Sequence, residues 1–388
     1  MSHPVDQTIT FSKEEIQRYG RHLVLPDIAM EGQKRLKGAS VLLIGTGGLG
    51  SPAAIYLAAA GVGKLGLVDF DVVDHSNLQR QIIFKTDSIG EAKVDSARES
   101  LAQLNPNVEV ATHEVALTSR NAMEICSDYD LILDGTDNFQ TRYLANDVCV
   151  LLNKPYVYGS VMGLEGQASV FWARRGPCYR CLYPVPPPPD LVPSCAEGGV
   201  LGVLPGIIGL VQATESIKLI LDKGESLIGR LMIFDAMGMR FLEVGLRKDE
   251  NCPMCGRNPS IHELIDYDQF CGVSASVEED LTPDEIPLGA QEFSEQVKQS
   301  QVFLLDVREP HEWDICHLEG ATLIPSGELA DRLSEVDGSK PILVYCRDGT
   351  RSLEAIRLLY HSGYTSVRHL KGGILAWIDE IDPSLPKY

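Results

Sequence analysis

The chain has 388 residues, of which 44% are hydrophobic and 23% are charged, a balance typical of a soluble globular protein. This length accommodates two or three domains, and the composition argues against collagen-like, low-complexity and largely disordered chains. The net charge is −20, from 34 basic and 54 acidic side chains. We therefore expect no direct binding to nucleic acid or to an anionic membrane surface, since both repel a strongly acidic protein.

The first residues, MSHPVDQ, have neither the basic start nor the apolar core of an export signal. The longest nearly uncharged apolar stretch, residues 198–211, contains Pro205 and is shorter than the ~20 residues that a bilayer span requires. These features predict a cytoplasmic protein. Ten cysteines in such a chain indicate metal ligands or reactive thiols before disulfides.

Strand and helix signals alternate along the first two thirds of the chain. Apolar runs predict strands at 41–44, 64–71, 130–137, 155–160 and 230–236. Helical patterns occupy residues 51–60, 91–104 and 207–221. This alternation predicts a doubly wound, mostly parallel α/β sheet of the Rossmann type.

A second, smaller α/β pattern follows an acidic, serine-rich stretch around residues 259–285. It begins with an apolar run at 302–309 and continues with a strand and a helix over 342–361. We therefore expect a first domain over residues 1–260, a linker over 261–282 and a second domain over 283–388.

A glycine-rich loop follows the first predicted strand. Gly45, Gly47 and Gly50 fit the pattern G-x-G-x-x-G between a strand and a helix, where backbone N–H groups can hold phosphate. Asp69 ends the next strand, where a carboxylate can accept ribose hydroxyls. By itself this pattern is that of a dinucleotide-binding domain, so an NAD-dependent oxidoreductase is the first alternative.

Two cations and a further carboxylate favour a different nucleotide. Arg80 lies just beyond the second strand and Lys93 near the start of the next helix, and both suit a triphosphate and its leaving pyrophosphate. Asp137, in the sequence DGTDN, lies at the edge of the sheet where a ligand binds. A carboxylate at that position can hold Mg²⁺ against phosphates.

The motifs RYGRH (18–22), GTGGLGSP, DFDVVDHSNLQRQ and DGTDN, together with paired cysteines, resemble the MoeB/ThiF family, the bacterial relatives of ubiquitin-activating enzymes. The resemblance covers about residues 14–260 and implies that ATP adenylates the C-terminal glycine of a small ubiquitin-like sulfur carrier. It implies Mg²⁺ at Asp137 and ATP contacts by the glycine loop with Gly48, and by Asp69, Ser76, Asn77, Arg80, Lys93 and Asn138. It also matches Arg21 with an arginine that reaches into the neighbouring subunit, which implies a homodimer.

Four cysteines form two C-x-x-C pairs, Cys178 with Cys181 and Cys252 with Cys255. Four thiolates satisfy a closed tetrahedral Zn²⁺ site, which here would cross-link two distant segments of the first domain. Two separate redox pairs are the alternative. Cys195 lies on a segment flanked by glycine and proline, where the family resemblance places a candidate thioester or acyl-disulfide cysteine; a small loop cysteine is the other interpretation.

Cys346, in the sequence YCRDGTRS, lies between an apolar strand and a helix, so that loop N–H groups converge on its sulfur. Arg347 and Arg351 add positive charge, and we expect them to lower the pKa of the thiol. This loop, DVRE (306–309) and LKGGILAW (370–377) resemble rhodanese sulfurtransferases over about residues 283–388. The C-x-x-x-x-R spacing matches the shorter rhodanese loop, whereas the related phosphatases use one more residue.

These features together predict an adenylyltransferase fused to a sulfurtransferase. The first domain would use ATP and Mg²⁺ to form an acyl-AMP on a carrier that ends in Gly-Gly, with Zn²⁺ as a structural ion. Sulfur from a cysteine desulfurase or thiosulfate would form a persulfide on Cys346, which attacks the activated carbonyl. Reduction or attack by Cys195 would then release the thiocarboxylate.

Three alternatives compete with this interpretation: the NAD-dependent oxidoreductase, a non-catalytic scaffold with the same fold, and a cyanide-detoxifying rhodanese with a vestigial partner domain. The chemistry fits the carriers of molybdopterin, thiamine and cysteine synthesis and of tRNA thiolation.

Overall fold

A computed structural model describes residues 8–187, 199–272, 287–298 and 301–388 of the chain. The chain divides into two compact units, residues 1–274 and 275–388, which we describe separately.

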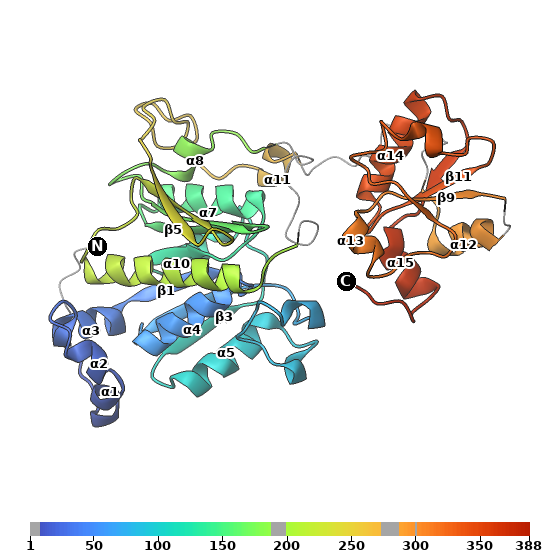
Figure 1. Ribbon diagram of the computed structural model, residues 1–388. Coiled ribbons are helices and arrows are strands. Elements are labelled where there is room, and N and C mark those ends of the chain that lie inside the picture. Colours follow the sequence, from blue (N-terminus) through green and yellow to red (C-terminus); the bar gives the residue numbers. More distant parts are fainter. Residues whose placement is uncertain (1–7, 188–198, 273–286, 299–300) are drawn as a thin grey trace. The chain divides into compact units, whose positions relative to one another are not determined.

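An eight-stranded sheet forms the centre of the first unit, in the order β3-β2-β1-β4-β5-β6-β7-β8 (Figure 1). The strands are β1 (Ser40–Ile44), β2 (Lys64–Val68), β3 (Glu109–His113), β4 (Leu131–Asp134), β5 (Tyr156–Met162), β6 (Glu165–Phe171), β7 (Arg230–Asp235) and β8 (Arg240–Gly245). Strands β1 to β5 pair in parallel, and β6, β7 and β8 extend the sheet in antiparallel pairing. The prediction of a mostly parallel sheet is confirmed, and the strand predicted at 230–236 belongs to its antiparallel part.

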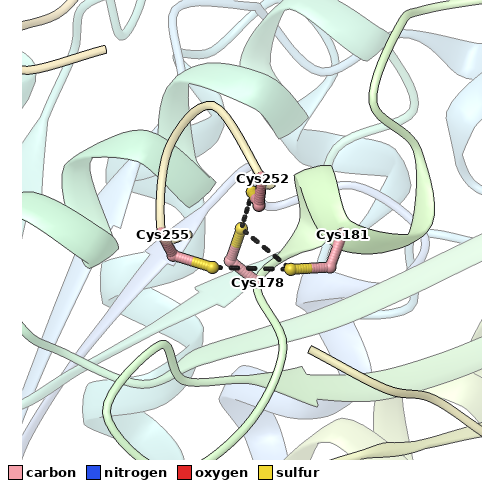
Figure 2. A group of neighbouring side chains, drawn as sticks. All are labelled: Cys178, Cys181, Cys252 and Cys255. Carbon is pink, nitrogen blue, oxygen red and sulfur yellow. Dashed lines mark hydrogen bonds between the residues drawn. The ribbon is translucent and has the colours of Figure 1, made fainter. Parts of the chain in front are cut away.

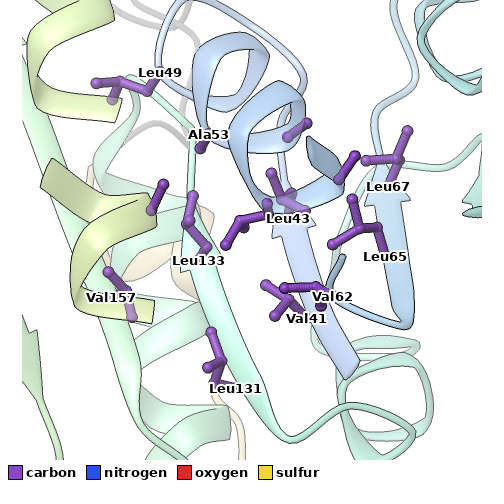
Figure 3. Close-up of a cluster of buried hydrophobic side chains, with 14 of the residues drawn as sticks. Val41, Leu43, Leu49, Ala53, Val62, Leu65, Leu67, Leu131, Leu133 and Val157 are labelled. Carbon is purple, nitrogen blue, oxygen red and sulfur yellow. The ribbon is translucent and has the colours of Figure 1, made fainter. Parts of the chain in front are cut away.

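Side chains along the parallel strands alternate between the two faces of the sheet. One face packs Leu43, Leu65 and Leu133 under α4 (Gly50–Ala60), α5 (Lys93–Leu104) and α10 (Val203–Leu221) (Figure 3). The opposite face packs Leu42, Ile44 and Ile132 under α6 (Ala122–Ser127) and α7 (Phe139–Leu151). Because both faces are buried, these strands are apolar at successive positions, and the expected doubly wound arrangement is present.

Helix α10 is long and apolar enough to cross a membrane by length and composition alone. It packs instead against α4, β5 and β6, and its polar residues bond within that core. The Gln212 side-chain amide donates to the carbonyls of Asp134 (2.6 Å) and Val157 (3.1 Å), and the Glu215 carboxylate accepts from the Leu227 N–H (2.8 Å). Core packing therefore explains its apolar sequence.

Part of the segment predicted as a linker packs on the first unit. Helix α11 (Tyr267–Phe270) packs on α7, and the Tyr267 hydroxyl donates to the Asp147 carboxylate at 2.9 Å. Leu264 and Ile265 join the same core, which explains why residues 261–272 fold against the first unit. Residues 273–282 of the predicted linker lie outside the described residues.

Four further helices of the first unit are described. They are α1 (Lys13–Arg18), α2 (Gly20–Leu23), α3 (Ala29–Gly38) and α8 (Tyr179–Leu182).

The second unit has a parallel four-stranded sheet in the order β10-β9-β11-β12 (Figure 1). Its elements are α12 (Ala290–Lys298), β9 (Phe303–Asp306), α13 (Pro310–Trp313), β10 (Thr322–Leu323), β11 (Ile342–Tyr345), α14 (Thr350–His361), β12 (Val367–His369) and α15 (Gly373–Glu380). Separate apolar clusters cover the two faces of the sheet, one including residues of α14 and the other including residues of α12 and α15. The expected smaller α/β domain is confirmed, and residues 346–349 connect β11 directly to α14.

Candidate functional site

A cavity of about 320 Å³ lies at the carboxyl ends of β1, β2 and β4. The chain leaves β1 toward β2 on one side, while β4 flanks β1 on the other, so the strand order reverses at this edge. Ligands of doubly wound sheets bind at such a point. The predicted nucleotide residues in the cavity wall are Gly45, Gly47, Gly48, Asp69, Asn77, Arg80, Lys93, Asp137 and Asn138. Of the described residues with a predicted nucleotide role, Gly50 and Ser76 do not line it.

Close backbone packing shapes the glycine loop between β1 and α4. Gly45 has a φ of +87°, in the left-handed region that favours glycine. A Cβ atom on Gly50 would lie 2.0 Å from the Gly45 carbonyl oxygen, and one on Gly135 would lie 2.6 Å from it. Gly50 therefore lets the first turn of α4 approach the loop closely.

Asp69, just after β2, is fixed by neighbouring hydrogen bonds. One carboxylate oxygen accepts from the Thr46 N–H (2.9 Å) and the Thr46 hydroxyl (2.8 Å), and the other accepts from the Asp71 N–H (3.1 Å). These bonds hold the carboxylate at the cavity wall, where the oxygen that accepts from Asp71 has a further lone pair for a ribose hydroxyl.

Lys93 and Arg80, the two cations predicted to bind phosphate, both line the cavity but have different partners. Buried Lys93 pairs through Nζ with the carboxylate of half-exposed Asp71 at 2.8 Å. Arg80 donates to the Ser76 carbonyl at 3.1 Å. The Ser76 hydroxyl donates to the Asp74 carboxylate at 2.6 Å, so this hydroxyl is engaged outside the cavity wall.

Asp137 and Asn138 follow β4 and lie on the exposed side of the cavity wall. The Asn138 side-chain oxygen accepts from the Thr141 N–H at 2.9 Å and so caps the N-terminus of α7. This cap fixes the turn that carries Asp137, whose carboxylate lies beside the glycine loop in the same cavity.

The sequence analysis did not single out two buried side chains of the cavity wall, Gln81 and Arg142. Gln81 Oε1 and Arg142 Nε have no hydrogen-bond partner among the described residues. Arg142 donates to the Thr136 carbonyl at 3.4 Å. Burial raises the pKa of the Asp134 carboxylate, and the positive charge of Arg142 partly opposes this effect. Their positions beside two motifs could have pointed to them. Gln81 is the last residue of SNLQRQ, and Arg142 follows DGTDN by about one helical turn.

Arg21 is exposed on α2 and is not part of the cavity wall among the described residues of its own chain. Two apolar side chains beside it are also exposed, Val24 at 74% and Leu25 at 49%.

The four predicted zinc ligands converge from α8 and from a loop after β8 (Figure 2). Their sulfur atoms all lie within 4.8 Å of one another, with Cys178 at 3.6 Å from Cys252 and Cys181 at 3.4 Å from Cys255. A tetrahedron with Zn–S bonds of ~2.3 Å has S···S edges of ~3.8 Å. The donor set therefore fits one Zn²⁺, and none of the nine described cysteines forms a disulfide. Cys195 lies outside the described residues.

Cys346 is fully buried in the loop between β11 and α14. Its sulfur accepts from the Gly349 N–H at 3.1 Å and lies 3.6 Å from the Ser352 hydroxyl. Gly349 has a φ of +107°, which turns this N–H back toward the sulfur. The loop therefore converges on the sulfur as the sequence predicted.

The expectation of a lowered pKa at Cys346 is wrong, although Arg351 favours the thiolate. Burial raises the pKa of this thiol, and the hydrogen bonds from Ser352 and Gly349 only partly oppose that effect. The Arg351 guanidinium binds both Glu312 carboxylate oxygens, at 2.7 and 2.8 Å. The Arg347 guanidinium donates to the Tyr388 carbonyl at 2.9 and 3.2 Å. Both positive charges therefore have partners other than the sulfur.

Two family profiles match this chain, the ThiF family over residues 19–254 and the rhodanese-like domain over residues 289–380. A Mycobacterium tuberculosis protein named probable adenylyltransferase/sulfurtransferase MoeZ is 47% identical, over 99% of this chain and 98% of its own length. The adenylyltransferase and sulfurtransferase MOCS3 of Drosophila ananassae is 46% identical, over 97% of this chain and 86% of its own.

Solved structures with a similar fold have lower sequence identity. MccB of E. coli in complex with MccA-N7isoASN gives a TM-score of 0.57 at 20% identity, covering 64% of this chain and 76% of that one. PaaA gives a TM-score of 0.53 at 24% identity, covering 63% and 78%. These likenesses establish the fold.

Proposed function

Since this chain belongs to the ThiF family and carries a rhodanese-like domain, it is an adenylyltransferase and sulfurtransferase, and we propose that its substrate is a ubiquitin-like sulfur carrier. The observation that carries the proposal is the single cavity wall in which the glycine loop, two cations and Asp137 meet. The carrier's C-terminal glycine carboxylate would be activated there as an acyl-AMP.

The cavity wall offers a group for each part of ATP. Phe70, Val115 and Leu117 supply apolar surface for the base, and Asp69 accepts from the ribose hydroxyls. Arg80, Lys93 and the loop N–H groups neutralise the phosphates. Asp137 would hold Mg²⁺, which when bound adds positive charge against the pyrophosphate as it leaves.

The adenylation step requires positioning and charge neutralisation more than proton transfer. A carboxylate oxygen of the carrier attacks the α-phosphorus, the new O–P bond forms, and pyrophosphate leaves with the electron pair of the broken P–O bond. The carboxylate is already ionised near neutral pH, so the step needs no general base. The buried Arg142 Nε, which has no partner among the described residues, offers a donor to one of the two approaching anions.

The rest of the cavity wall suits a tail without side chains. Val161, Val200 and Pro205 supply apolar surface beyond the phosphate groups. A tail that ends in Gly-Gly has no side chain to collide with these residues. We therefore place the Gly-Gly tail, and not a nicotinamide ring, on this apolar surface next to the α-phosphate.

We assign the homodimer to the surface of α2. Exposed apolar Val24 and Leu25 favour burial in an interface, and Arg21 beside them would then extend into the neighbouring subunit's cavity. We assign Zn²⁺ to Cys178, Cys181, Cys252 and Cys255, where four thiolate ligands leave no open position and the ion is structural.

The second unit would supply the sulfur through Cys346. The sulfur of a persulfide on Cys346 attacks the acyl-adenylate carbonyl, AMP leaves with the electron pair, and an acyl disulfide forms. Cleavage of this disulfide requires a thiol, from Cys195 or an external reductant, which is oxidised to a disulfide as the thiocarboxylate leaves. Holding both activities on one chain raises the effective concentration of the persulfide near the adenylate.

The proposal is tested by ATP–pyrophosphate exchange with the purified chain, Mg²⁺ and a candidate ubiquitin-like carrier. We expect exchange with a carrier that ends in Gly-Gly and none with the same carrier lacking its last glycine. Thiosulfate should separately add one sulfur atom to Cys346, seen by mass spectrometry of its peptide. Exchange that no such carrier supports, together with NAD binding that ATP does not displace, would favour the oxidoreductase instead.

A further inference from the structure

The Cys346 sulfur must ionise in a buried setting that favours the neutral thiol. Sulfur transfer by a cysteine proceeds through the thiolate, and burial raises the pKa of this group. Because Arg347 and Arg351 bind the Tyr388 carbonyl and Glu312, neither guanidinium is available as an unpaired charge beside the sulfur. Because both charges are shared with other partners, hydrogen bonds to the sulfur also have to favour the thiolate.

The Gly349 N–H and the Ser352 hydroxyl contact the sulfur at 3.1 and 3.6 Å, and the Ser352 N–H also stabilises its charge. Ser352 lies in the first turn of α14 and is fully buried. Its hydroxyl also lies 2.9 Å from the Gly349 carbonyl, so the direction in which it donates decides whether it stabilises the sulfur.

A buried histidine lies behind this hydroxyl. His369, the last residue of β12, is 5% exposed, and its Nδ1 lies 3.1 Å from the Ser352 oxygen. Burial lowers the pKa of His369 to about 4, so its ring is neutral at pH 7 and one nitrogen carries a proton. A protonated Nδ1 donates to the Ser352 oxygen and leaves the hydroxyl proton free to turn toward the sulfur.

We propose that Ser352 and His369 are positioning residues of the sulfur transfer. The Ser352 hydroxyl donates to the Cys346 sulfur whenever that atom is anionic, and His369 Nδ1–H holds the serine oxygen in place. The proposal rests on the function proposed above for Cys346. In the resting thiol the direction is reversed, and the Cys346 S–H donates to the Ser352 oxygen.

The hydrogen bond from Ser352 stabilises the Cys346 thiolate both when the persulfide forms and when it gives up its outer sulfur. Cys346 first loses its proton to water, and its thiolate attacks the outer sulfur of a donor such as thiosulfate. The new S–S bond forms while the S–S bond of the donor breaks, and sulfite leaves with the electron pair. When cyanide takes the outer sulfur in the sulfurtransfer assay below, the C–S bond forms, the S–S bond breaks and Cys346 leaves as a thiolate, to which Ser352 again donates.

Other charged groups act on this pair from the surrounding elements. Asp348, in the loop, lies 3.9 Å from the sulfur and opposes its ionisation, whereas Arg351 of α14 favours it. Arg368, next to His369 on β12, keeps the imidazole neutral. None of these three groups changes in the variants below, so a change in the pH profile reports on Ser352 and His369.

The test measures how alkylation of Cys346 by iodoacetamide depends on pH, quantified on its own peptide in the full chain, together with thiosulfate–cyanide sulfurtransfer. Ser352→Ala should shift the alkylation profile to higher pH and reduce kcat/KM at pH 7 by about tenfold, because a hydrogen bond to a charged group is lost. The loss should shrink at alkaline pH. Ser352→Thr, which keeps the hydroxyl, should restore the wild-type profile.

A second pair of variants tests the histidine. The amide nitrogen of His369→Asn can take the place of Nδ1, so this variant should remain close to wild type. His369→Gln extends its amide toward the position of Nε2 and should behave like Ser352→Ala. Ser362→Ala, on the same helix with its hydroxyl bonded to the Leu358 carbonyl, is the matched control and should leave both measurements unchanged.

Coincident alkylation profiles for Ser352→Ala and the wild type would overturn the inference, as would an equal loss in Ser352→Thr, which indicates packing alone. If Ser352→Ala fails to fold, equal profiles for the two His369 variants would overturn it as well. Cys346→Ala separates this outcome from failure of the proposed function. Sulfurtransfer that persists in Cys346→Ala refutes the role of the cysteine itself.

Discussion

Asp137 and Lys93 differ in the contacts that each must give up before it can bind its ligand, Mg²⁺ for Asp137 and phosphate for Lys93. Asp137 is exposed at the cavity wall, whereas Lys93 is buried and ion-paired with Asp71 at 2.8 Å. Removing the partner of a buried charge is strongly unfavourable, so incoming phosphate must replace Asp71 as the partner of Lys93. Lys93 therefore discriminates in favour of ligands with enough negative charge to compete with a carboxylate.

Replacing Asp137 removes the carboxylate that we assign to Mg²⁺. We expect Asp137→Asn to reduce carrier-dependent ATP–pyrophosphate exchange by at least about a hundredfold, because the leaving pyrophosphate loses the charge of its metal ion. Asp87→Asn, at an exposed aspartate outside the cavity wall, is the control and should exchange normally. Full exchange in Asp137→Asn would refute the assigned role.

His369 makes the stability of the second unit depend on pH. The pKa of this group is about 4 in the fold and about 6.5 in an unfolded chain, so the unfolded state binds its proton first. The stabilisation is complete above pH 6.5 and is lost as the pH falls toward 4, by about 3 kcal/mol at most.

Urea unfolding between pH 7 and 4.5 tests this dependence through the fluorescence of Trp313 and Trp377, both in the second unit, in a Trp172→Phe background. The free energy of unfolding should fall less steeply with decreasing pH in His369→Asn than in the parent chain. Equal pH dependence in the two chains would contradict the pKa assigned to His369.

At this scale the sequence predicted which residues gather, but not how their charges are paired. The partners of the two loop arginines, Glu312 and Tyr388, lie far from Cys346 in the sequence, and only the fold brings them to the loop. Arg142 escaped prediction for a similar reason, since an arginine within a helix is ordinarily exposed, and its burial depends on β5 and the loop after β4.

Among the elements, the parallel strands were predictable because both of their faces are buried. β1 and β4 contain continuous apolar runs of four and three residues, at 41–44 and 131–133. β3 and β8 were not predicted: β3 is only partly buried along its length, and every residue of β8 is exposed, so neither has the pattern of a core strand. The antiparallel direction of β7 follows from its pairing with β6, which depends on contacts beyond the strand itself.

The four-cysteine cluster and a buried ion pair hold a very short helix in place. Helix α8 has four residues, too few to be stable alone, and the buried Arg180–Asp147 pair (2.7 Å) joins it to α7. The cysteine sulfurs join the same helix to the loop at residues 252–255. Bound Zn²⁺ would therefore fix α8 to a segment about 70 residues away in the sequence.

Zinc analysis by mass spectrometry should find one ion per chain. Cys252→Ser should lose the zinc and several kcal/mol of stability, lowering the Tm of the first unit, since a structural site contributes its binding free energy to folding. Cys271→Ala is the control: this cysteine is also buried but lies outside the cluster, and the variant should keep its zinc. A zinc-free wild-type protein whose four thiols all react freely would contradict the assignment.

For the molecule as a whole, two units carry two activities that share one substrate in our proposal. The sequence predicted this division from a change in pattern, and the contacts place it between residues 274 and 275. Leu264, Ile265 and Tyr267, which fall in the predicted linker, pack on the core of the first unit. A local sequence pattern predicts a helix or a strand, but where a folded unit ends depends on the core against which that helix or strand packs.

The most direct measurement is intact mass spectrometry of a carrier ending in Gly-Gly after incubation with the chain, ATP, Mg²⁺ and thiosulfate, with a thiol reductant. We predict that the carrier exchanges one oxygen for one sulfur, and that Cys346→Ala abolishes this change while its carrier-dependent ATP–pyrophosphate exchange continues. A carrier that gains sulfur equally with Cys346→Ala, or that is never adenylated, would contradict the account.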